Sequence, residues 1–328
     1  MSPTNRVTPQ ITIRQHYIPQ FYMRKFTDDD NKIGVLNCKL HKLTPRKSPK
    51  SIACEDFFYG LQTGVPDDIS QSVEDFFQDL EGKFSRLLPA IEEKILTGQK
   101  IEGGEKWHIA LFMSMLWIRG PAMREHHRMV SEDLARQMMA MTFSRSKEDI
   151  NAFFNSFDRD RGEITTPEQR KTIIDGFNKN KFKMNISNHL HMRMFESIDN
   201  FANLFAAKNW TIYINKTRTG FITTDNPVAE ILPPITGFYG PDFFSRDHYF
   251  AFSPKVFIHC RPSINRGGKS IRRKTLFEED ERKVLELNML LSYRAMKFIY
   301  GSEVTLKTIL GVISFAKKQQ FKALTQKS

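Results

Sequence analysis

Two segments of the sequence place polar side chains that can handle protons inside apolar runs. One is residues 15–26, which contains His16, and the other is residues 221–228, which contains Asp225 and Asn226. A histidine titrates near neutral pH, and a carboxylate can orient or activate it. Because polar groups are costly to bury unless they are paired, we predict that the two segments form one composite polar site.

Within that site we predict a direct or single-water contact between His16 and Asp225, on the order of 3–6 Å. His16 is the predicted general acid or base, Asp225 orients or activates it, and Asn226 holds an oxyanion or a phosphate oxygen. Each residue has a structural alternative, because His16 can bond to backbone and Asp225 or Asn226 can close an Asx-turn. Three neighbouring residues are predicted to contact the substrate: Gln20, Arg24 and Thr224.

Arg119 stands at a break between two apolar stretches that we expect to be helices. It precedes Gly120 and Pro121, and in this apolar setting its guanidinium needs an acidic or anionic partner. An ion pair with Glu74 or Glu81 is one interpretation, and a clamp on a substrate phosphate is the other. We include Arg119 among the predicted catalytic residues, as a group that stabilises developing negative charge.

The formal net charge of +12 is concentrated in the last quarter of the chain. Residues 253–328 contain 16 Lys and Arg against 6 Asp and Glu, a surplus of 10 positive charges. Such a basic face attracts polyanions by releasing counterions, although it can also serve only solubility. We therefore predict RNA or DNA as the partner. Five cations in a glycine-containing stretch, which we expect to be a loop, should hold the phosphate backbone: Arg266, Lys269, Arg272, Arg273 and Lys274.

Other features narrow the class of protein. No apolar run approaches the roughly 20 residues that span a membrane, so no membrane association is expected. Three cysteines without CxxC spacing indicate neither a disulfide framework nor a zinc site, and a cytoplasmic location is expected. Walker A, GxGxxG and GxSxG motifs are absent, which disfavours ATP-driven chemistry, dinucleotide binding and lipase-type catalysis. No metal ligands and no cofactor are predicted, with a Mg²⁺ ion bound by Asp225 and a distant Glu as the alternative.

The pattern of apolar residues indicates an α+β protein. Residues 1–14 are expected to be a flexible arm, and residues 15–328 a single domain. Helical periodicity runs from about residue 68 to residue 208, and the alternation typical of strands begins at Asn209, where we expect a hairpin. We predict a small, mostly antiparallel sheet formed by both flanks of the chain, with a large helical block inserted between them.

The order of the motifs resembles a known family. Residues 16–26 resemble the opening motif of the family catalogued as domain of unknown function 4238, which is roughly His-Tyr-Val-Pro-Gln, aromatic, Leu-Arg-x-Phe. Three later blocks of that family are similar to residues 55–59, 119–121 and 221–228, with Thr224 in place of the usual serine. The resemblance covers about residues 15–300 and implies no activity. It implies that one site contains His16, Arg119, Asp225 and Asn226.

Our leading hypothesis is a soluble enzyme that acts on a phosphate-containing polyanion, in the first place a nuclease in a phage-defence or toxin-like role. The lack of metal-ligand spacing favours a metal-independent reaction, such as attack by an RNA 2′-hydroxyl. The alternative is a non-catalytic nucleic-acid-binding or regulatory module, in which the polar motifs are buried structural networks. An open cleft containing His16 and Asp225 favours the enzyme, and full burial with complete pairing favours the module. The sequence fixes neither the substrate nor the oligomeric state.

Overall fold

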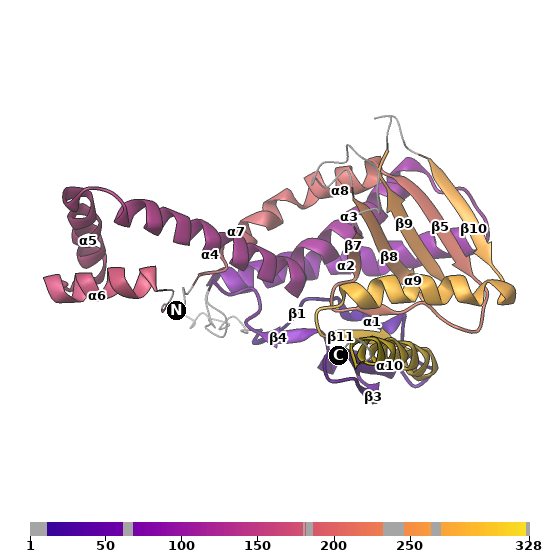
Figure 1. Cartoon of the computed structure of the whole chain (residues 1–328). Helices are drawn as coiled ribbons and strands as arrows, with labels where there is room; N and C mark the ends of the chain where they lie inside the picture. Colours follow the sequence, from indigo (N-terminus) through magenta and orange to yellow (C-terminus); the bar gives the residue numbers. More distant parts are fainter. Residues whose placement is uncertain are drawn as a thin grey trace, which may run out of the picture.

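The computed structural model describes residues 12–61, 68–179, 181, 186–231, 246–263 and 270–325, with the backbone alone for residues 315–325 (Figure 1). The helices are α1 (Gln20–Arg24), α2 (Asp68–Leu96), α3 (Gly103–Arg119), α4 (Pro121–Phe143), α5 (Lys147–Arg161), α6 (Pro167–Asn178), α7 (His189–Arg193), α8 (Ile198–Ala207), α9 (Glu281–Arg294) and α10 (Glu303–Thr325). Short 3-10 turns are η1 (Pro49–Ser51), η2 (Met194–Ser197) and η4 (Glu278–Asp280). The strands are β1 (Arg14–His16), β2 (Ile33–Asn37), β3 (Lys42–Lys47), β4 (Cys54–Asp56), β5 (Asn209–Asn215), β6 (Thr223–Thr224), β7 (Val228–Ile231), β8 (Asp247–Ser253), β9 (Val256–Arg261), β10 (Ile271–Leu276) and β11 (Phe298–Gly301).

The predicted α+β class is confirmed, and a block of helices from α2 to α8 lies between two groups of strands. Helix α2 buries Phe77, Phe84 and Leu88 along one side, at the three- and four-residue spacing of an amphipathic helix. It continues through Pro89, where the sequence predicts a kink or break. Pro89 lies on the solvent side of the helix, so water can hydrate the carbonyl that loses its hydrogen bond.

The predicted sheet shared by the two flanks is present, and two further sheets accompany it. The shared sheet has the strand order β3-β2-β11-β6, in which β2 from the first flank pairs with β11 from the second. A five-stranded sheet has the order β10-β5-β9-β8-β7, and β1 pairs with β4 in a third sheet. The predicted arm falls mainly on residues outside the described ones, and Arg14 already belongs to β1.

The hairpin predicted after Asn209 is wrong. Strand β5 pairs with β9 and β10, whereas β6 pairs with β11 in the other sheet. Alternation of side chains identifies a strand and its buried face, but it does not identify the neighbouring strand. The connection after β5 is held by Asn215, whose side-chain amide donates to the carbonyls of Thr219 and Pro254.

The five-stranded sheet has one face packed against helices and one face that the described residues cover only in part. On the helix side, Trp210, Phe250 and Ile258 are fully buried, and the ring of Phe250 lies 6.1 Å from that of Phe112 in α3. On the other face, α9 contacts β7, β8 and β10, and Figure 1 shows it lying across one end of the strands. We call the part of this face beyond α9 the open face of the sheet.

Helices α4, α5 and α6 extend away from the sheets (Figure 1). We call these three helices the arm from here on, and they are separate from the flexible arm predicted for residues 1–14. At its tip, the ring of Phe143 packs against those of Phe153 and Phe177, with centroids 5.6 and 5.3 Å away. None of the described helices is both long and apolar enough to cross a membrane.

Candidate functional site

The two polar segments singled out in the sequence come together in the fold. The hydroxyls of Tyr22 and Thr223 lie 2.9 Å apart in the core, and Tyr22 donates to the carbonyl of Ala251 at 2.5 Å. Burial raises the pKa of the Tyr22 hydroxyl, which therefore stays protonated and can donate this bond. These bonds are closed to solvent, so they hold the two segments together and are not accessible to a substrate.

Asp225 is committed to the backbone between α9 and β11. Its carboxylate accepts hydrogen bonds from the N–H groups of Met296, Lys297 and Phe298 at 2.8, 2.7 and 2.9 Å. The residue is only 2% exposed, and burial raises the pKa of the carboxyl to about 6, against the opposing effect of the three N–H donors. Asp225 therefore fixes a turn, and among the described residues no hydrogen bond or ion pair joins it to His16.

Tyr17, one position after His16, is the residue of the first segment that interacts with Asp225. Its hydroxyl is hydrogen-bonded to that of Tyr300, and the nearby Asp225 carboxylate adds to burial in raising the Tyr17 pKa. The ring of His16 lies against the backbone of Pro49 and Lys50, and burial lowers its pKa. Strand β1 ends at His16, and Tyr17 lies in the bend that follows it.

The contacts of Arg119 are those expected for a structural ion pair. Its guanidinium donates to Glu81 at 2.7 Å, to the hydroxyl of Tyr59 at 2.8 Å and to the carbonyl of His16. It also stacks over the ring of Phe77, and it is only 1% exposed. These partners surround the guanidinium, so a substrate phosphate would have to displace them. Arg119 therefore ties β1 to α2 and α3.

The other predicted residues of the motifs make mostly local bonds. Gln20 accepts a bond from Arg24, one turn along α1, at 3.4 Å. The hydroxyl of Thr224 donates to the carbonyl of Asn226 and accepts from its N–H, which closes a turn. The side-chain amide of Asn226 donates to the carbonyl of Arg294 at 3.1 Å, so this residue, like Asp225, holds the end of α9.

Three of the five cations of the basic cluster, Arg272, Arg273 and Lys274, lie on strand β10 rather than in the loop that the sequence predicts. Arg272 and Lys274 are exposed on the open face of the sheet. Arg273 points to the opposite face, where its guanidinium donates to the carbonyls of Gly98 and Gln99 after α2. Strand geometry alternates the side chains in this way, so only two of these three cations share a face. The two remaining predicted cations lie outside the described residues: Arg266 and Lys269.

A histidine–carboxylate pair occupies the open face, at two residues that no motif of the sequence marks. The Nε2 atom of His259, on β9, lies 2.8 Å from Oδ2 of Asp247, on β8. The hydroxyl of Tyr249 donates to the same oxygen at 3.3 Å, and its ring stacks on the imidazole with centroids 4.3 Å apart and planes inclined by 14°. The side chains of His259 and Asp247 are 13% and 15% exposed, so both are partly open to solvent.

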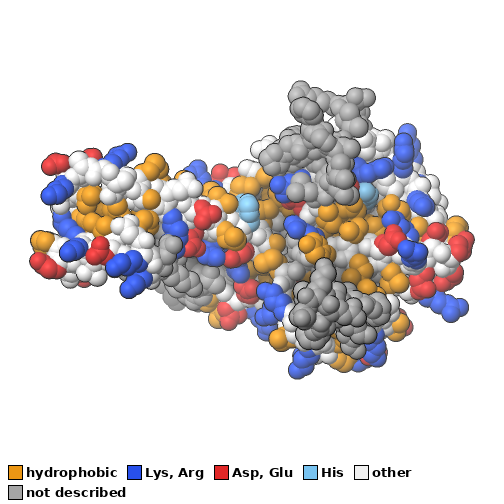
Figure 2. Space-filling model, viewed as in Figure 1, with side chains coloured by type: hydrophobic (Ala, Val, Ile, Leu, Met, Phe, Trp, Pro, Cys, Tyr) orange, Lys and Arg blue, Asp and Glu red, His pale blue; other side chains and the backbone are white. Residues whose placement is uncertain are grey.

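Cations flank this pair along the sheet. The register of the strands places Arg272, Thr211, His259 and Tyr249 in one row across β10, β5, β9 and β8. With strands about 4.8 Å apart, Arg272 starts about 10 Å from His259. Arg261 is exposed near the end of β9, and its guanidinium donates to the hydroxyl of Thr211 at 3.3 Å. Figure 2 views this side and shows Lys and Arg side chains towards β5 and β10.

The arrangement is chemically suited to acid–base catalysis on a negatively charged group. A carboxylate that accepts the Nε2–H of a histidine leaves Nδ1 as a base and stabilises the protonated ring. Burial and the nearby Asp247 carboxylate raise the pKa of Tyr249, so its hydroxyl stays protonated as a donor. The signal in the sequence was the alternation along β8 and β9, where the polar or aromatic positions share one face. Among the described residues, no group of three or more His, Cys, Asp or Glu side chains is placed to hold a metal ion.

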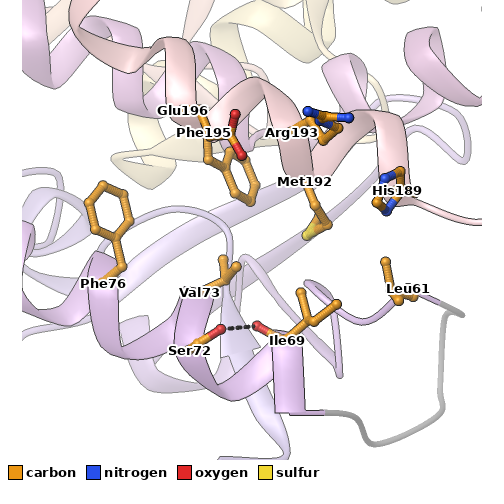
Figure 3. Close-up of a pocket in the computed structure, with 10 residues that line it drawn as sticks. All are labelled: Leu61, Ile69, Ser72, Val73, Phe76, His189, Met192, Arg193, Phe195 and Glu196. Carbon is orange, nitrogen blue, oxygen red and sulfur yellow. Dashed lines mark hydrogen bonds between the residues drawn. The ribbon is translucent and has the colours of Figure 1, made fainter.

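A more apolar pocket lies between α2 and the segment that contains α7 and η2. It has a volume of about 370 Å³, and Figure 3 shows Ile69 and Val73 of α2 facing Met192 and Phe195. His189 lies at one end of this pocket. No hydrogen bond of His189 to a carboxylate is described, so the pocket has the character of a binding surface rather than of a reaction centre.

Comparison with known proteins adds the family. The model of the family described as Protein of unknown function (DUF4238) matches residues 14–305. The chain belongs to this family. The match confirms the resemblance seen in the motifs, and it spans the open face as well as both polar segments of this DUF4238 protein. No curated protein and no solved structure matches the chain.

Proposed function

We propose that the protein is a nuclease that binds single-stranded nucleic acid on the open face of the five-stranded sheet and cleaves it with His259. The observation that carries this proposal is the pair of His259 and Asp247, held at 2.8 Å, with His259 in one row with the exposed Arg272. His259 takes the acid–base role predicted for His16, because His16 contacts backbone and no hydrogen bond or ion pair joins it to Asp225 among the described residues.

The open face supplies both kinds of contact that single-stranded nucleic acid needs. Arg261, Arg272 and Lys274 are exposed and can bind phosphates through charge, without reading sequence. Tyr213 and Tyr249 stand on the same face and are partly exposed, so their rings can stack on bases. A duplex offers no free base faces, so single strands fit this surface better.

For RNA the reaction needs no metal ion. Nδ1 of His259 takes the proton of a 2′-hydroxyl, the 2′-oxygen attacks the adjacent phosphorus, and the bond from phosphorus to the 5′-oxygen breaks. Water protonates the leaving oxygen, and the products are a 2′,3′-cyclic phosphate and a 5′-hydroxyl. Asp247 stabilises the imidazolium, and an arginine next to it, Arg261 or Arg272, stabilises the charge on the phosphoryl oxygens.

The test is incubation of the purified full-length chain with end-labelled RNA and with single-stranded DNA of the same sequence, each with EDTA and with Mg²⁺. We expect RNA to be cleaved in EDTA to fragments with cyclic phosphate ends, and DNA to be bound but left intact. Cleavage of both only in Mg²⁺ would replace this mechanism with a metal-dependent one. The absence of both binding and cleavage would remove the proposal.

A non-catalytic nucleic-acid-binding module is the second candidate, and the burial of Asp225 and Arg119 favours it. In that case the same face binds RNA, and His259 and Asp247 serve only to order the sheet. A toxin-like or defence role requires the catalytic candidate. Growth inhibition by the expressed protein in a bacterial cytoplasm, relieved by His259→Ala, would support that role, and inhibition that survives the substitution would not.

A further inference from the structure

The family motifs build a second cavity, away from the open face. It has a volume of about 390 Å³ and lies between the start of α4, strand β7 and the end of α9. Asp225 and Asn226 hold the backbone of residues 294–298 from two sides, and Asn226 and Arg294 line the cavity themselves. A Cβ atom at the position of Gly120 would lie 3.9 Å from the backbone oxygen of Asp225, and Ala122 and Met123, in the first turn of α4, line the cavity.

The charges around this cavity favour an anion. Arg246 and Glu230 form an ion pair with each other, while the side chain of Arg294 makes no hydrogen bond or ion pair to the described residues. Two arginines and one glutamate leave a net charge of +1. A ligand with one or two negative charges would therefore be attracted to Arg294, with Arg246 and Glu230 neutralising one another.

The start of α4 adds hydrogen-bond donors. The helix has 23 residues, begins at Pro121, and has Gly120 at its N-cap with no side-chain cap. The N–H groups of the first turn have no acceptor within the helix, and the helix dipole is positive at this end. Ala122 and Met123, in that first turn, line the cavity, so their N–H groups are available to oxygen atoms of an anion.

A histidine adds a polar group to the cavity wall. His127 lines the cavity and is only 9% exposed. Its Nδ1 atom lies 3.2 Å from Nδ1 of His191, and its Nε2 atom makes no hydrogen bond to the described residues. A ligand oxygen in the cavity could therefore form a hydrogen bond with this nitrogen.

We propose that this cavity binds a nucleoside monophosphate, with the phosphate between Arg294, Asn226 and the start of α4. The apolar side chains of Trp117, Met194 and Val228 also line the cavity, and they offer surface to a flat base. The volume is at the lower end of the range of small-molecule sites, roughly 300–1,000 Å³. This site lies on the helix side of the sheet and does not depend on the proposed nuclease activity.

The experiment is a calorimetric titration of the full-length chain with each of the four ribonucleoside monophosphates and with inorganic phosphate. We expect at least one nucleotide to bind more tightly than phosphate alone. Arg294→Gln removes the charge but leaves the backbone carbonyl that Asn226 binds, and it should weaken binding at least about tenfold, the effect of one charge-assisted hydrogen bond. Arg282→Gln is the matched control, since Arg282 is on the same helix with its side chain 91% exposed.

Two further variants keep the proposal falsifiable. Ala122→Asp adds a carboxylate to the first turn of α4, where it suits the helix dipole, so the protein should fold but lose nucleotide binding by repulsion. The double variant R272E/K274E on the open face should bind the nucleotide like wild type. Failure of all four nucleotides and of phosphate to bind wild type would overturn the proposal, and so would loss of binding in R272E/K274E but not in Arg294→Gln.

Discussion

His259 and Asp247 lie on neighbouring strands of one sheet, and their side chains meet at 2.8 Å on its open face. The stacked ring of Tyr249 restricts how the imidazole can turn. A histidine oriented by a carboxylate is a common arrangement for general acid–base catalysis, and here exposed cations stand beside it. Three of the motif residues make structural hydrogen bonds instead. Asp225 and Asn226 hold the end of α9 and the start of β11, and Arg119 holds β1.

Asp247→Asn should slow RNA cleavage by a factor on the order of 10²–10⁴, because the amide can no longer stabilise the imidazolium or fix its tautomer. RNA affinity should change little, since the substitution keeps the shape of the side chain. Single-turnover cleavage at saturating protein measures this, with Asp160→Asn on the arm as the control. Equal rates for wild type and Asp247→Asn would show that the pair has only a structural role.

Reversing two charges on β10 should weaken RNA binding without unfolding the protein. In R272E/K274E the slope of log affinity against log salt should flatten by about 0.7 for each lost phosphate contact to a single strand. Circular dichroism should be unchanged, because exposed charges contribute little stability. The control is K147E/K171E, which changes the net charge equally on exposed positions of the arm. If both double variants lose affinity alike, net charge rather than the open face governs binding.

Asp225→Asn should destabilise the fold by about 1–3 kcal/mol, because an amide has one acceptor oxygen for three backbone N–H groups. Urea denaturation gives this difference directly. RNA cleavage at a temperature where the variant is folded should remain near the wild-type rate. A variant as stable as wild type but inactive would return Asp225 to the catalytic role that the sequence predicted.

Asp225 should also affect how the free energy of unfolding depends on pH. Burial raises the folded-state pKa of Asp225 to about 6, above the roughly 3.9 of an unfolded chain. The folded protein therefore holds this proton more tightly than the unfolded chain does. The resulting contribution to the free energy of unfolding is fully present below about pH 4 and is lost as the pH rises through about 6. Asp225→Asn should lack this decline between pH 4 and 6. Parallel curves of unfolding free energy for the two proteins would contradict the raised pKa.

Arg119→Met should lower the free energy of unfolding by about 3 kcal/mol. Three buried or half-buried acceptors lose their shared donor: the Glu81 carboxylate, the Tyr59 hydroxyl and the His16 carbonyl. Thermal unfolding and urea titration both report the loss. Arg136→Met on α4, whose side chain is paired with Glu132 near the surface, should cost far less. An Arg119→Met protein with wild-type stability and weakened RNA affinity would support the phosphate clamp instead.

The sequence predicted the class of the fold well because periodicity is a local property. The switch from helical spacing to alternation at Asn209 marks the true start of β5, and the helices of the inserted block follow their apolar residues. Strand pairing is not local, so Ile212 revealed a buried face but not that its neighbours would be β9 and β10. The sequence predicts a loop for the three cations on β10, because the glycines just before them indicate a loop more strongly than the short alternating run indicates a strand.

The candidate site was harder to predict for a related reason. Asp225 and Arg119 are polar residues in apolar surroundings, a pattern that catalytic and structural residues share, and only their partners separate the two roles. His259 and Asp247 are 12 positions apart and become neighbours only when β8 pairs with β9. Alternation along each strand could have placed them on one face, but the pairing register that brings them together depends on the whole sheet.

The most direct test of the central claim is the cleavage rate of His259→Ala measured together with its RNA affinity. A fluorescent RNA that reports binding by anisotropy and cleavage by gel allows both measurements in one sample. We expect affinity within about threefold of wild type, because the cations on β9 and β10 remain, and a cleavage rate lower by a factor on the order of 10² or more. A His259→Ala protein that binds RNA and cleaves it at the wild-type rate would contradict the claim.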